Sequence, residues 1–238
     1  MPALATARST PAPGLKLPLL GRAAGAMLLA LTALPALAGP PTASCPGSPA
    51  LAESASVDLL DAGILSSTPL LPGTTVATRG ADETTMPQIV GKVMIDESLP
   101  FSFPALGGGQ ISGTLQQRVV NAANGSCDCQ WRIILSPASA PGLRITALRL
   151  QGLVHPDQGL FADFRIDKYQ AGIPSTKASR QGQNVQFRFP AGIGPGQSSR
   201  LVFLDTARNA VAYLGNIVLV ANDGSRSTAR LPAYVTTF

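Results

Sequence analysis

The sequence predicts an all-β fold, an antiparallel β-sandwich of about nine strands that follows a signal peptide and an extended linker. Charged residues make up only 13% of the chain, against a usual share of about 25%. Glycine and proline are abundant, at 24 and 21 residues, and both interrupt helices and supply turns. Short apolar segments recur along the chain, and no window after the signal peptide has the periodicity of a convincing amphipathic helix.

The apolar segments are the strand candidates. Val185-Gln-Phe-Arg-Phe189 alternates apolar and polar residues, the pattern of a sheet with one buried face, with Gln186 and Arg188 on the other face. Around Ala147 the alternation slips, which predicts a β-bulge. The turn Asn222-Asp-Gly224 predicts a hairpin into the last strand, and a short turn is expected over 205–213. Strands are expected over residues 89–95, 111–120, 127–135, 143–150, 161–166, 185–189, 200–205, 217–221 and 228–235.

Three segments are expected along the chain. Residues 1–38 form the signal peptide, residues 39–84 an extended linker, and residues 85–238 the β-sandwich domain. The first part of the linker is rich in proline and small residues and poor in charge. Within it, the apolar segment 57–65 is a candidate for an additional first strand.

The amino-terminal segment has the pattern of an export signal. Arg8, Lys16 and Arg22 precede an apolar core over residues 23–37, which is shorter than the roughly 20 residues of a membrane span. Ala36-Leu37-Ala38 then provides a small-residue cleavage site before Gly39. We therefore expect an exported protein, periplasmic or extracellular, with no membrane span after cleavage. A retained membrane anchor is the alternative.

Lipidation at Cys45 is a weaker alternative for attachment to a membrane. Thr42 stands where a lipoprotein signal has leucine, and seven residues separate the apolar core from the cysteine. We therefore do not expect a lipid anchor at Cys45.

The charge balance argues against nucleic acid as a partner. The whole chain has a net charge of +5, but the signal peptide holds three of its 18 basic residues, so 15 basic and 13 acidic residues remain, a net charge of +2. No stretch interleaves aromatic side chains with a basic stripe. Nucleic-acid binding is therefore not expected.

Three cysteines remain after cleavage, and an oxidising compartment favours a disulfide among them. Cys127 and Cys129 would point to the same face of a strand and could not easily bridge to each other. We therefore expect Cys45 to bond one of the two and to leave one thiol free. The alternative is a C-x-C metal or redox site, which is disfavoured because metal sites normally need four ligands and His155 is the only histidine.

Two parts of the chain resemble a known group of proteins. Ile111-Ser-Gly-Thr-Leu-Gln-Gln-Arg-Val-Val120 with Gly125-Ser-Cys-Asp-Cys-Gln-Trp-Arg-Ile133, and later the segment 187–201, are similar to motifs of uncharacterised exported bacterial β-sandwich proteins, including the ectodomains of PEP-CTERM-type surface proteins. The resemblance implies the sandwich fold and no particular activity. Residues 234–238 carry no Pro-Glu-Pro motif, so sorting by that system is not expected.

No catalytic, metal-binding or cofactor-binding set is recognisable. His155 precedes a proline in a turn and has no nucleophile beside it. Asp163 and Asp167 could share a strand face as a glycosidase pair, but scattered surface carboxylates explain them equally well. The remaining candidates considered were loop ligands for calcium at Asp157, Asn222 and Asp223 and a glycosylation sequon at Asn124, which we interpret as turn residues.

Trp131 is the only tryptophan and shares a strand face with Cys129. A core tryptophan packed near a disulfide is the favoured interpretation, and a stacking platform for a ligand is the alternative. Tyr169, Tyr213 and Tyr234 are too far apart in the sequence to predict a binding strip.

These observations favour a non-enzymatic secreted or cell-envelope protein with a binding, adhesive or structural role. Its partner would be an envelope glycan or another surface protein. Two alternatives stay open: a carbohydrate-binding or carbohydrate-processing domain that uses carboxylates and Trp131, and a surface subunit that exchanges strands.

Overall fold

The computed structural model describes residues 42–45, 69–86, 89, 91–122, 125–153, 160–166, 171–205, 210–227 and 231–236. The expected signal peptide with its cleavage site and the apolar segment 57–65 lie outside these ranges. The same holds for five individual candidates: Asn124, His155, Asp157, Asp167 and Tyr169.

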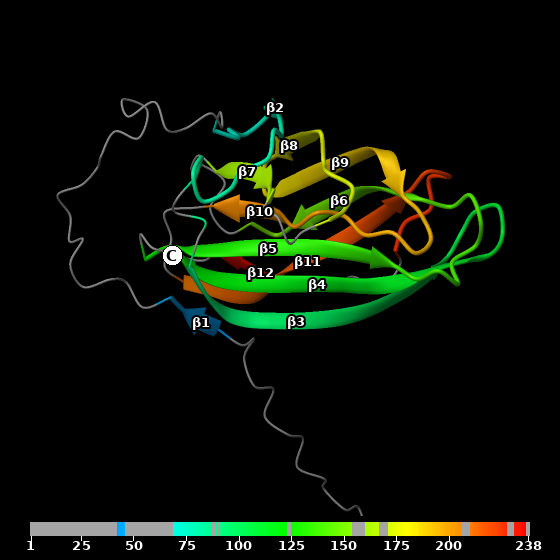
Figure 1. Cartoon of the computed structure of the whole chain (residues 1–238), viewed down its shortest axis with the longest axis horizontal. Helices are drawn as coiled ribbons and strands as arrows, with labels where there is room; N and C mark the ends of the chain where they lie inside the picture. Colours follow the sequence, from blue (N-terminus) through cyan, green and yellow to red (C-terminus); the bar gives the residue numbers. More distant parts are fainter. Residues whose placement is uncertain are drawn as a thin grey trace, which may run out of the picture. The chain divides into compact units, whose positions relative to one another are not determined.

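Two antiparallel sheets pack as a sandwich, which confirms the predicted fold class (Figure 1). The seven-stranded sheet contains β1 (Thr42–Ser44), β2 (Thr75–Ala77), β6 (Ile145–Gln151), β8 (Lys177–Gln181), β9 (Asn184–Ile193), β11 (Ala210–Ala221) and β12 (Leu231–Thr236). The five-stranded sheet contains β3 (Gly91–Pro104), β4 (Gln110–Ala122), β5 (Cys127–Leu135), β7 (Phe161–Phe164) and β10 (Val202–Asp205).

Many strands that are neighbours in a sheet are not consecutive in the sequence. In the seven-stranded sheet the order is β1-β11-β6-β9-β8-β2, with β12 also paired to β11. In the five-stranded sheet the order is β3-β4-β5-β10-β7. Consecutive strands pair in β3-β4-β5, β8-β9 and β11-β12, and the other strand pairs join segments that lie farther apart in the chain.

The structure has more strands than the sequence predicts. β1 and β2 come from residues 39–84, which we expected to be an extended linker, and they pair with β11 and β8. β8 was missed because Lys177-Ala-Ser-Arg-Gln181 places a small residue and an arginine, Ala178 and Arg180, at its buried positions. The short turn expected over 205–213 is wrong from residue 210 onward, because β11 begins at Ala210.

The core lies between the two sheets and is formed by the inward-facing residues of both. Leu115 of β4 and Ile133 of β5 face each other in register from the five-stranded sheet, and Leu148 and Phe187 do so from β6 and β9. All four side chains are fully buried. The predicted bulge near Ala147 is confirmed, because the register of β6 shifts between Ile145 and Ala147 against both neighbouring strands.

A second, smaller core covers part of the outer face of the five-stranded sheet. Ala81, Met86 and Ile89 of the segment before β3 pack on Phe203 of β10. This segment is held by Asp163 of β7, whose Oδ1 accepts hydrogen bonds from the backbone N–H groups of residues 79 and 80 at 3.0 and 2.8 Å. The outer face of the five-stranded sheet is therefore partly closed.

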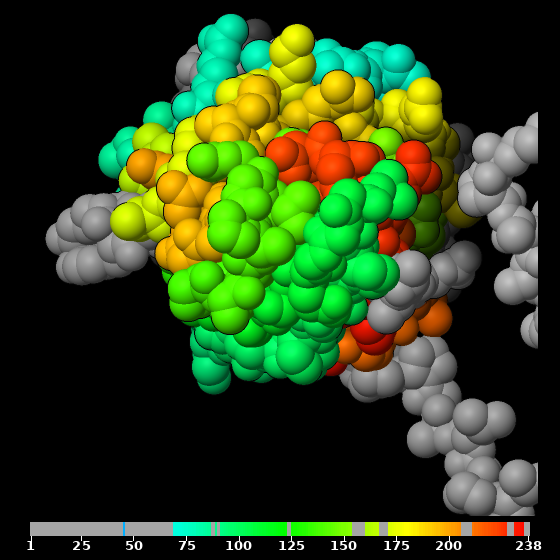
Figure 2. Space-filling view, turned by 90° about the vertical axis from the view of Figure 1, so that its right-hand side faces the viewer, coloured from blue at the N-terminus to red at the C-terminus, as the bar shows by residue number. Residues whose placement is uncertain are grey.

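At one end of the sandwich the turns of the two sheets meet (Figure 2). The carboxylate of Asp223, in the turn after β11, accepts a hydrogen bond of 2.8 Å from the N–H of Leu106 in the turn between β3 and β4. Among the residues that the structure describes, no helix has the length and apolar character needed to cross a membrane.

Candidate binding face

The outer face of the seven-stranded sheet carries polar side chains in register across adjacent strands. Ser179 of β8 lies opposite Gln186 of β9, and Gln186 lies opposite Arg149 of β6. Residues directly opposite each other on antiparallel strands share a face. The inward-facing residues between them belong to the core, so these three side chains point away from the other sheet.

A second row runs parallel to the first along the same face. Lys177 lies opposite Arg188, Arg188 opposite Ala147, and Ala147 opposite Val220, which forms an isolated bridge with Arg226. Lys177, Arg188 and Arg226 are exposed. Since the two rows are two residues apart along each strand, the face presents a grid of charged and amide groups with a spacing of about 5 Å between strands.

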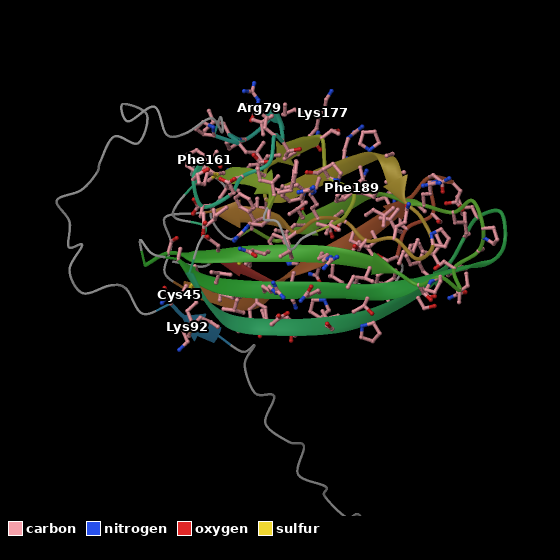
Figure 3. The ribbon with its side chains drawn as sticks, in the orientation of Figure 1. Cys45, Arg79, Lys92, Phe161, Lys177 and Phe189 are labelled. Atoms are coloured by element: carbon pink, nitrogen blue, oxygen red, sulfur yellow. A yellow bond between two sulfur atoms is a disulfide. The ribbon has the colours of Figure 1, made fainter. Side chains whose placement is uncertain are left out.

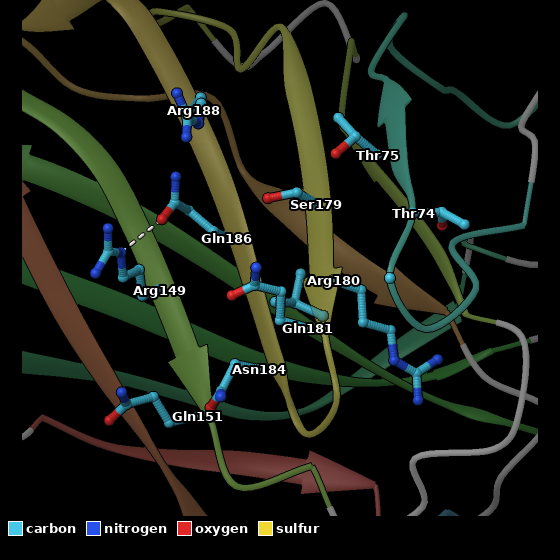
Figure 4. Close-up of a pocket in the computed structure, with 12 residues that line it drawn as sticks. Thr74, Thr75, Arg149, Gln151, Ser179, Arg180, Gln181, Asn184, Gln186 and Arg188 are labelled. Carbon is cyan, nitrogen blue, oxygen red and sulfur yellow. Dashed lines mark hydrogen bonds between the residues drawn. The ribbon is translucent and has the colours of Figure 1, made fainter.

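Two adjoining depressions lie over this grid. The first has a volume of about 410 Å³ and is bordered by Thr74, Ser179, Asn184 and Gln181, among others, as the close-up in Figure 4 shows. The second has a volume of about 300 Å³ and extends toward Thr146 and Val220. Arg149, Gln186 and Arg188 line both depressions, which therefore adjoin, and we refer to the two together as the groove, which lies over β8, β9, β6 and β11.

Gln186 holds the side chain of Arg149 in place. The Nε of Arg149 donates a hydrogen bond of 2.5 Å to Oε1 of Gln186, the dashed line in Figure 4. Partial burial lowers the pKa of Arg149, and the nearby positive charges of Arg226 and Arg188 lower it further. The guanidinium groups of Arg226 and Arg188 are therefore close enough to repel that of Arg149.

Arg180 also borders the groove but has a structural role. Its side chain is 1% exposed, and its Nη1 and Nε donate to the carbonyl oxygens of Leu70 and Gly182, both at 3.2 Å. Arg180 therefore anchors the segment before β2, and its charge is not available to a ligand in the same way as that of Arg188.

The expected tether of Cys45 to the body of the domain is confirmed. Cys45 forms a disulfide with Cys127, with the two Cα atoms 5.6 Å apart, and Cys129 is a free, buried cysteine. Cys127 lies at the start of β5, opposite Asn121 in β4, whereas Cys129 lies two residues further along the strand. Burial raises the pKa of the Cys129 thiol, which makes it unreactive as a nucleophile or metal ligand.

Trp131 lies in the core and is only 1% exposed, so it offers no surface on which a ligand could stack. Its indole nitrogen has no hydrogen-bond partner. The structure brings together Tyr213 and Tyr234, which the sequence kept apart, with ring centroids 4.7 Å from each other. Gln117 lies beside them: it donates to the backbone oxygen of Pro232 and accepts from the N–H of Tyr234, so this cluster closes the side of the sandwich.

The carboxylate candidates bind the protein's own backbone. Besides residues 79 and 80, Asp163 accepts a hydrogen bond from the N–H of Phe164 at 2.8 Å. Asn222 accepts from the N–H of Arg144, and Asp223 accepts from Ser225 and Leu106. In the described ranges, no three His, Cys, Asp or Glu side chains are grouped so that they could hold a metal ion.

The groove residues were not predicted as a site. Gln186 and Arg188 were assigned correctly to the polar face of their strand, but their neighbours Arg149, Ser179 and Arg226 come from other parts of the chain. One sequence signal was present: the strands of the seven-stranded sheet contain arginine and lysine and no aspartate or glutamate. The absence of acidic residues becomes apparent only when it is known which strands belong to the same sheet.

Fold and groove together define an antiparallel β-sandwich with a grooved, polar face on one sheet. No protein family model matches this chain, and the searches of curated proteins and of solved structures gave no match either.

Proposed function

We propose that this chain is a non-enzymatic protein of the cell exterior that binds an extended ligand on the outer face of its seven-stranded sheet. The observation that carries the proposal is the groove of about 410 and 300 Å³, which crosses four strands and is lined by arginine, amide and hydroxyl groups. Such groups fix a ligand by hydrogen bonds and charge. Export is supported by the signal-peptide pattern and is consistent with the Cys45–Cys127 disulfide.

We propose that the protein has no catalytic role because the candidate catalytic and stacking residues have structural roles. The carboxylate of Asp163 is occupied by three backbone N–H groups, and Trp131 is in the core. The buried carboxyl of Asp128 lies on the five-stranded sheet, away from the groove. A binding role at the groove requires none of these residues.

Strand exchange between copies is disfavoured by the tether of the amino-terminal segment. β1 pairs with β11 of the same chain, and the disulfide that follows it joins Cys45 to Cys127. Donation of this segment to a second copy would require both connections to be broken. A monomeric binding module therefore fits better.

A steric block tests the proposal without any assumption about the ligand's charge. Purified mature protein is incubated with isolated envelope polysaccharide and a panel of soluble glycans, and the bound fraction is measured by co-sedimentation. Ser179→Trp fills the groove and should abolish binding, whereas Ser98→Trp, at an exposed position on β3 of the other sheet, should leave it unchanged.

Three results would contradict the proposal. They are binding that survives Ser179→Trp, absence of binding to every polymer tested, and release of new reducing ends by the wild-type protein. The last result would make the protein an enzyme.

A further inference from the structure

The acidic residues of the strands all lie in one of the two sheets, whereas basic residues occur in both. The seven-stranded sheet has Arg149, Lys177, Arg180 and Arg188 in its strands and no acidic residue. The acidic residues that lie within strands are all in the five-stranded sheet: Asp96, Glu97, Asp128, Asp163 and Asp205. A protein with a near-neutral balance therefore presents one sheet face that is purely cationic.

The positive charges on this face are not neutralised by the protein. Arg149, Arg188 and Arg226 form no ion pair with any described carboxylate. Exposed arginines are ordinarily interspersed with acidic residues, which relieves repulsion. Arg149 and Arg188 line the groove and Arg226 bridges to the lining residue Val220, so the charges of Arg188 and Arg226 repel that of Arg149, an arrangement that an anionic ligand would stabilise.

We propose that the ligand of this groove is a linear acidic polysaccharide, whose carboxylates are held by Arg149, Arg188 and Arg226. The inference rests on the proposed binding function and names the chemistry of its ligand. A guanidinium group binds a carboxylate through two parallel hydrogen bonds. Gln181, Asn184 and Ser179 supply the donors and acceptors that sugar hydroxyl groups require.

Arg149 is prepared for such a contact. Gln186 engages its Nε, which fixes the plane of the guanidinium group, and its two terminal nitrogens donate to no described protein group. A side chain that is already held in one conformation loses less entropy on binding. The groove therefore offers one fixed guanidinium and one exposed one, Arg188, and the exposed Arg226 lies beside the lining residue Val220.

Two other polyanions fit this face less well. Single-stranded nucleic acid is normally held by aromatic side chains that stack on its bases, and no aromatic side chain is among the described residues that line the groove. An anionic membrane is normally engaged by apolar side chains inserted beside the basic ones. The exposed large apolar residues, such as Leu71 and Val93, are not among the lining residues.

The test compares two polymers that differ only in charge. Binding of the mature protein to polygalacturonate and to the same polymer after full methyl esterification is measured by isothermal titration calorimetry at low salt. We expect at least about tenfold weaker binding of the esterified polymer, since hydrogen bonds to charged groups are lost. Affinity for polygalacturonate should also fall with rising ionic strength.

Matched variants locate the interaction. Arg188→Gln and Arg226→Gln should each weaken polygalacturonate binding by about tenfold. Lys92→Gln removes the same charge from the exposed start of β3, on the other sheet and far from Lys177 in Figure 3, and should leave the affinity unchanged. Gln186→Glu is nearly isosteric and places a carboxylate beside Arg149, so it should abolish binding while the protein stays folded.

The outcomes separate this inference from the binding function on which it rests. Equal affinity for both polymers, with binding still blocked by Ser179→Trp, overturns the acidic ligand and leaves a binding face for neutral glycans. Tighter binding of a single-stranded oligodeoxynucleotide, or loss of affinity in Lys92→Gln equal to that in Arg188→Gln, also overturns it. Absence of binding to either polymer and to the whole glycan panel overturns both.

Discussion

Asp128 of β5 and Asp205 of β10 lie side by side on neighbouring antiparallel strands, on the outer face of the five-stranded sheet, and both are buried. Leu204 of β10 lies opposite Cys129 of β5, and because the strands are antiparallel, the next pair in the register is Asp205 and Asp128. Burial raises the pKa of Asp128 well above its usual range, and the adjacent charge of Asp205 raises it further. One Oδ of Asp128 has no hydrogen-bond partner. The folded protein therefore binds a proton at this pair more strongly than the unfolded chain does.

This proton makes stability depend on pH in a defined direction. The folded state keeps a proton that the unfolded chain releases near pH 4, so stability is highest below that value and falls as the pH rises toward the folded-state pKa of Asp128. Asp128→Asn removes the charge, and should raise the free energy of unfolding at neutral pH by about 1–3 kcal/mol. Urea unfolding between acid and neutral pH measures this.

The control for Asp128 is Asp96→Asn. Asp96 is exposed and paired with Arg118 at 2.9 Å, so this variant should change stability by no more than about 0.5–1 kcal/mol. Parallel curves of stability against pH for the wild type and Asp128→Asn would show that the buried pair carries no proton.

Removal of the disulfide should destabilise the domain strongly. The bond closes a loop with a sequence separation of 82 residues. Replacement of Cys45 and Cys127 by serine is expected to lower the free energy of unfolding by about 2–5 kcal/mol, because the unfolded chain gains conformational freedom. Chemical denaturation of the double variant and the wild type gives the difference.

Thiol counting by intact mass serves as the control for that experiment. Alkylation of the native protein should add no label because Cys129 is buried, denaturation without reduction should add one, and reduction should add three. A native protein that takes up a label would place Cys129 at the surface, contrary to the structure.

Trp131 should report a buried environment. Its side chain is 1% exposed, so its fluorescence emission should be blue-shifted and resistant to quenching by iodide. Addition of a polymer that binds the groove should leave the emission unchanged. Ligand-dependent quenching at Trp131 would instead favour the carbohydrate-stacking alternative that the sequence left open.

Asp163 should stabilise the segment that covers the outer face of the five-stranded sheet. Asp163→Ala removes an acceptor used by three backbone N–H groups and should cost about 2–4 kcal/mol. Limited proteolysis should then cut within residues 79–86 before the rest of the domain. A cleavage pattern equal to that of the wild type would mean that the apolar contacts with Phe203 hold the segment alone.

Local pattern was sufficient for much of the fold. The alternation in residues 185–189, the slip around Ala147 and the turn at Gly224, whose φ is +87°, all have the conformations that the sequence predicts. β8 was missed because an alanine and an arginine occupy its buried positions, and the first half of β11 was missed because small residues interrupt its apolar pattern. Arg180 is the clearest case, since its buried guanidinium donates to the backbone carbonyl of Leu70, a contact that no local pattern predicts.

The binding face was less accessible to prediction than the fold. Arg149, Gln186 and Val220 are separated by dozens of residues, and only strand pairing places them around one groove. Tyr213 and Tyr234 likewise meet through the pairing of β11 with β12. No local sequence pattern predicts contacts between residues that lie so far apart in the chain.

By itself, the sequence determined the sheet class, the buried and exposed faces of its more regular strands, and the set of cysteines among which a disulfide would form. These features follow from the two-residue period of a strand and from turn chemistry, which act over a few residues. The tertiary structure alone decided that Cys127 rather than Cys129 bonds Cys45 and that the acid-free strands form one sheet, whereas the burial of Trp131 confirms the interpretation that the sequence favoured. Those outcomes depend on which distant strands pair, and that pairing minimises the free energy of the whole sandwich.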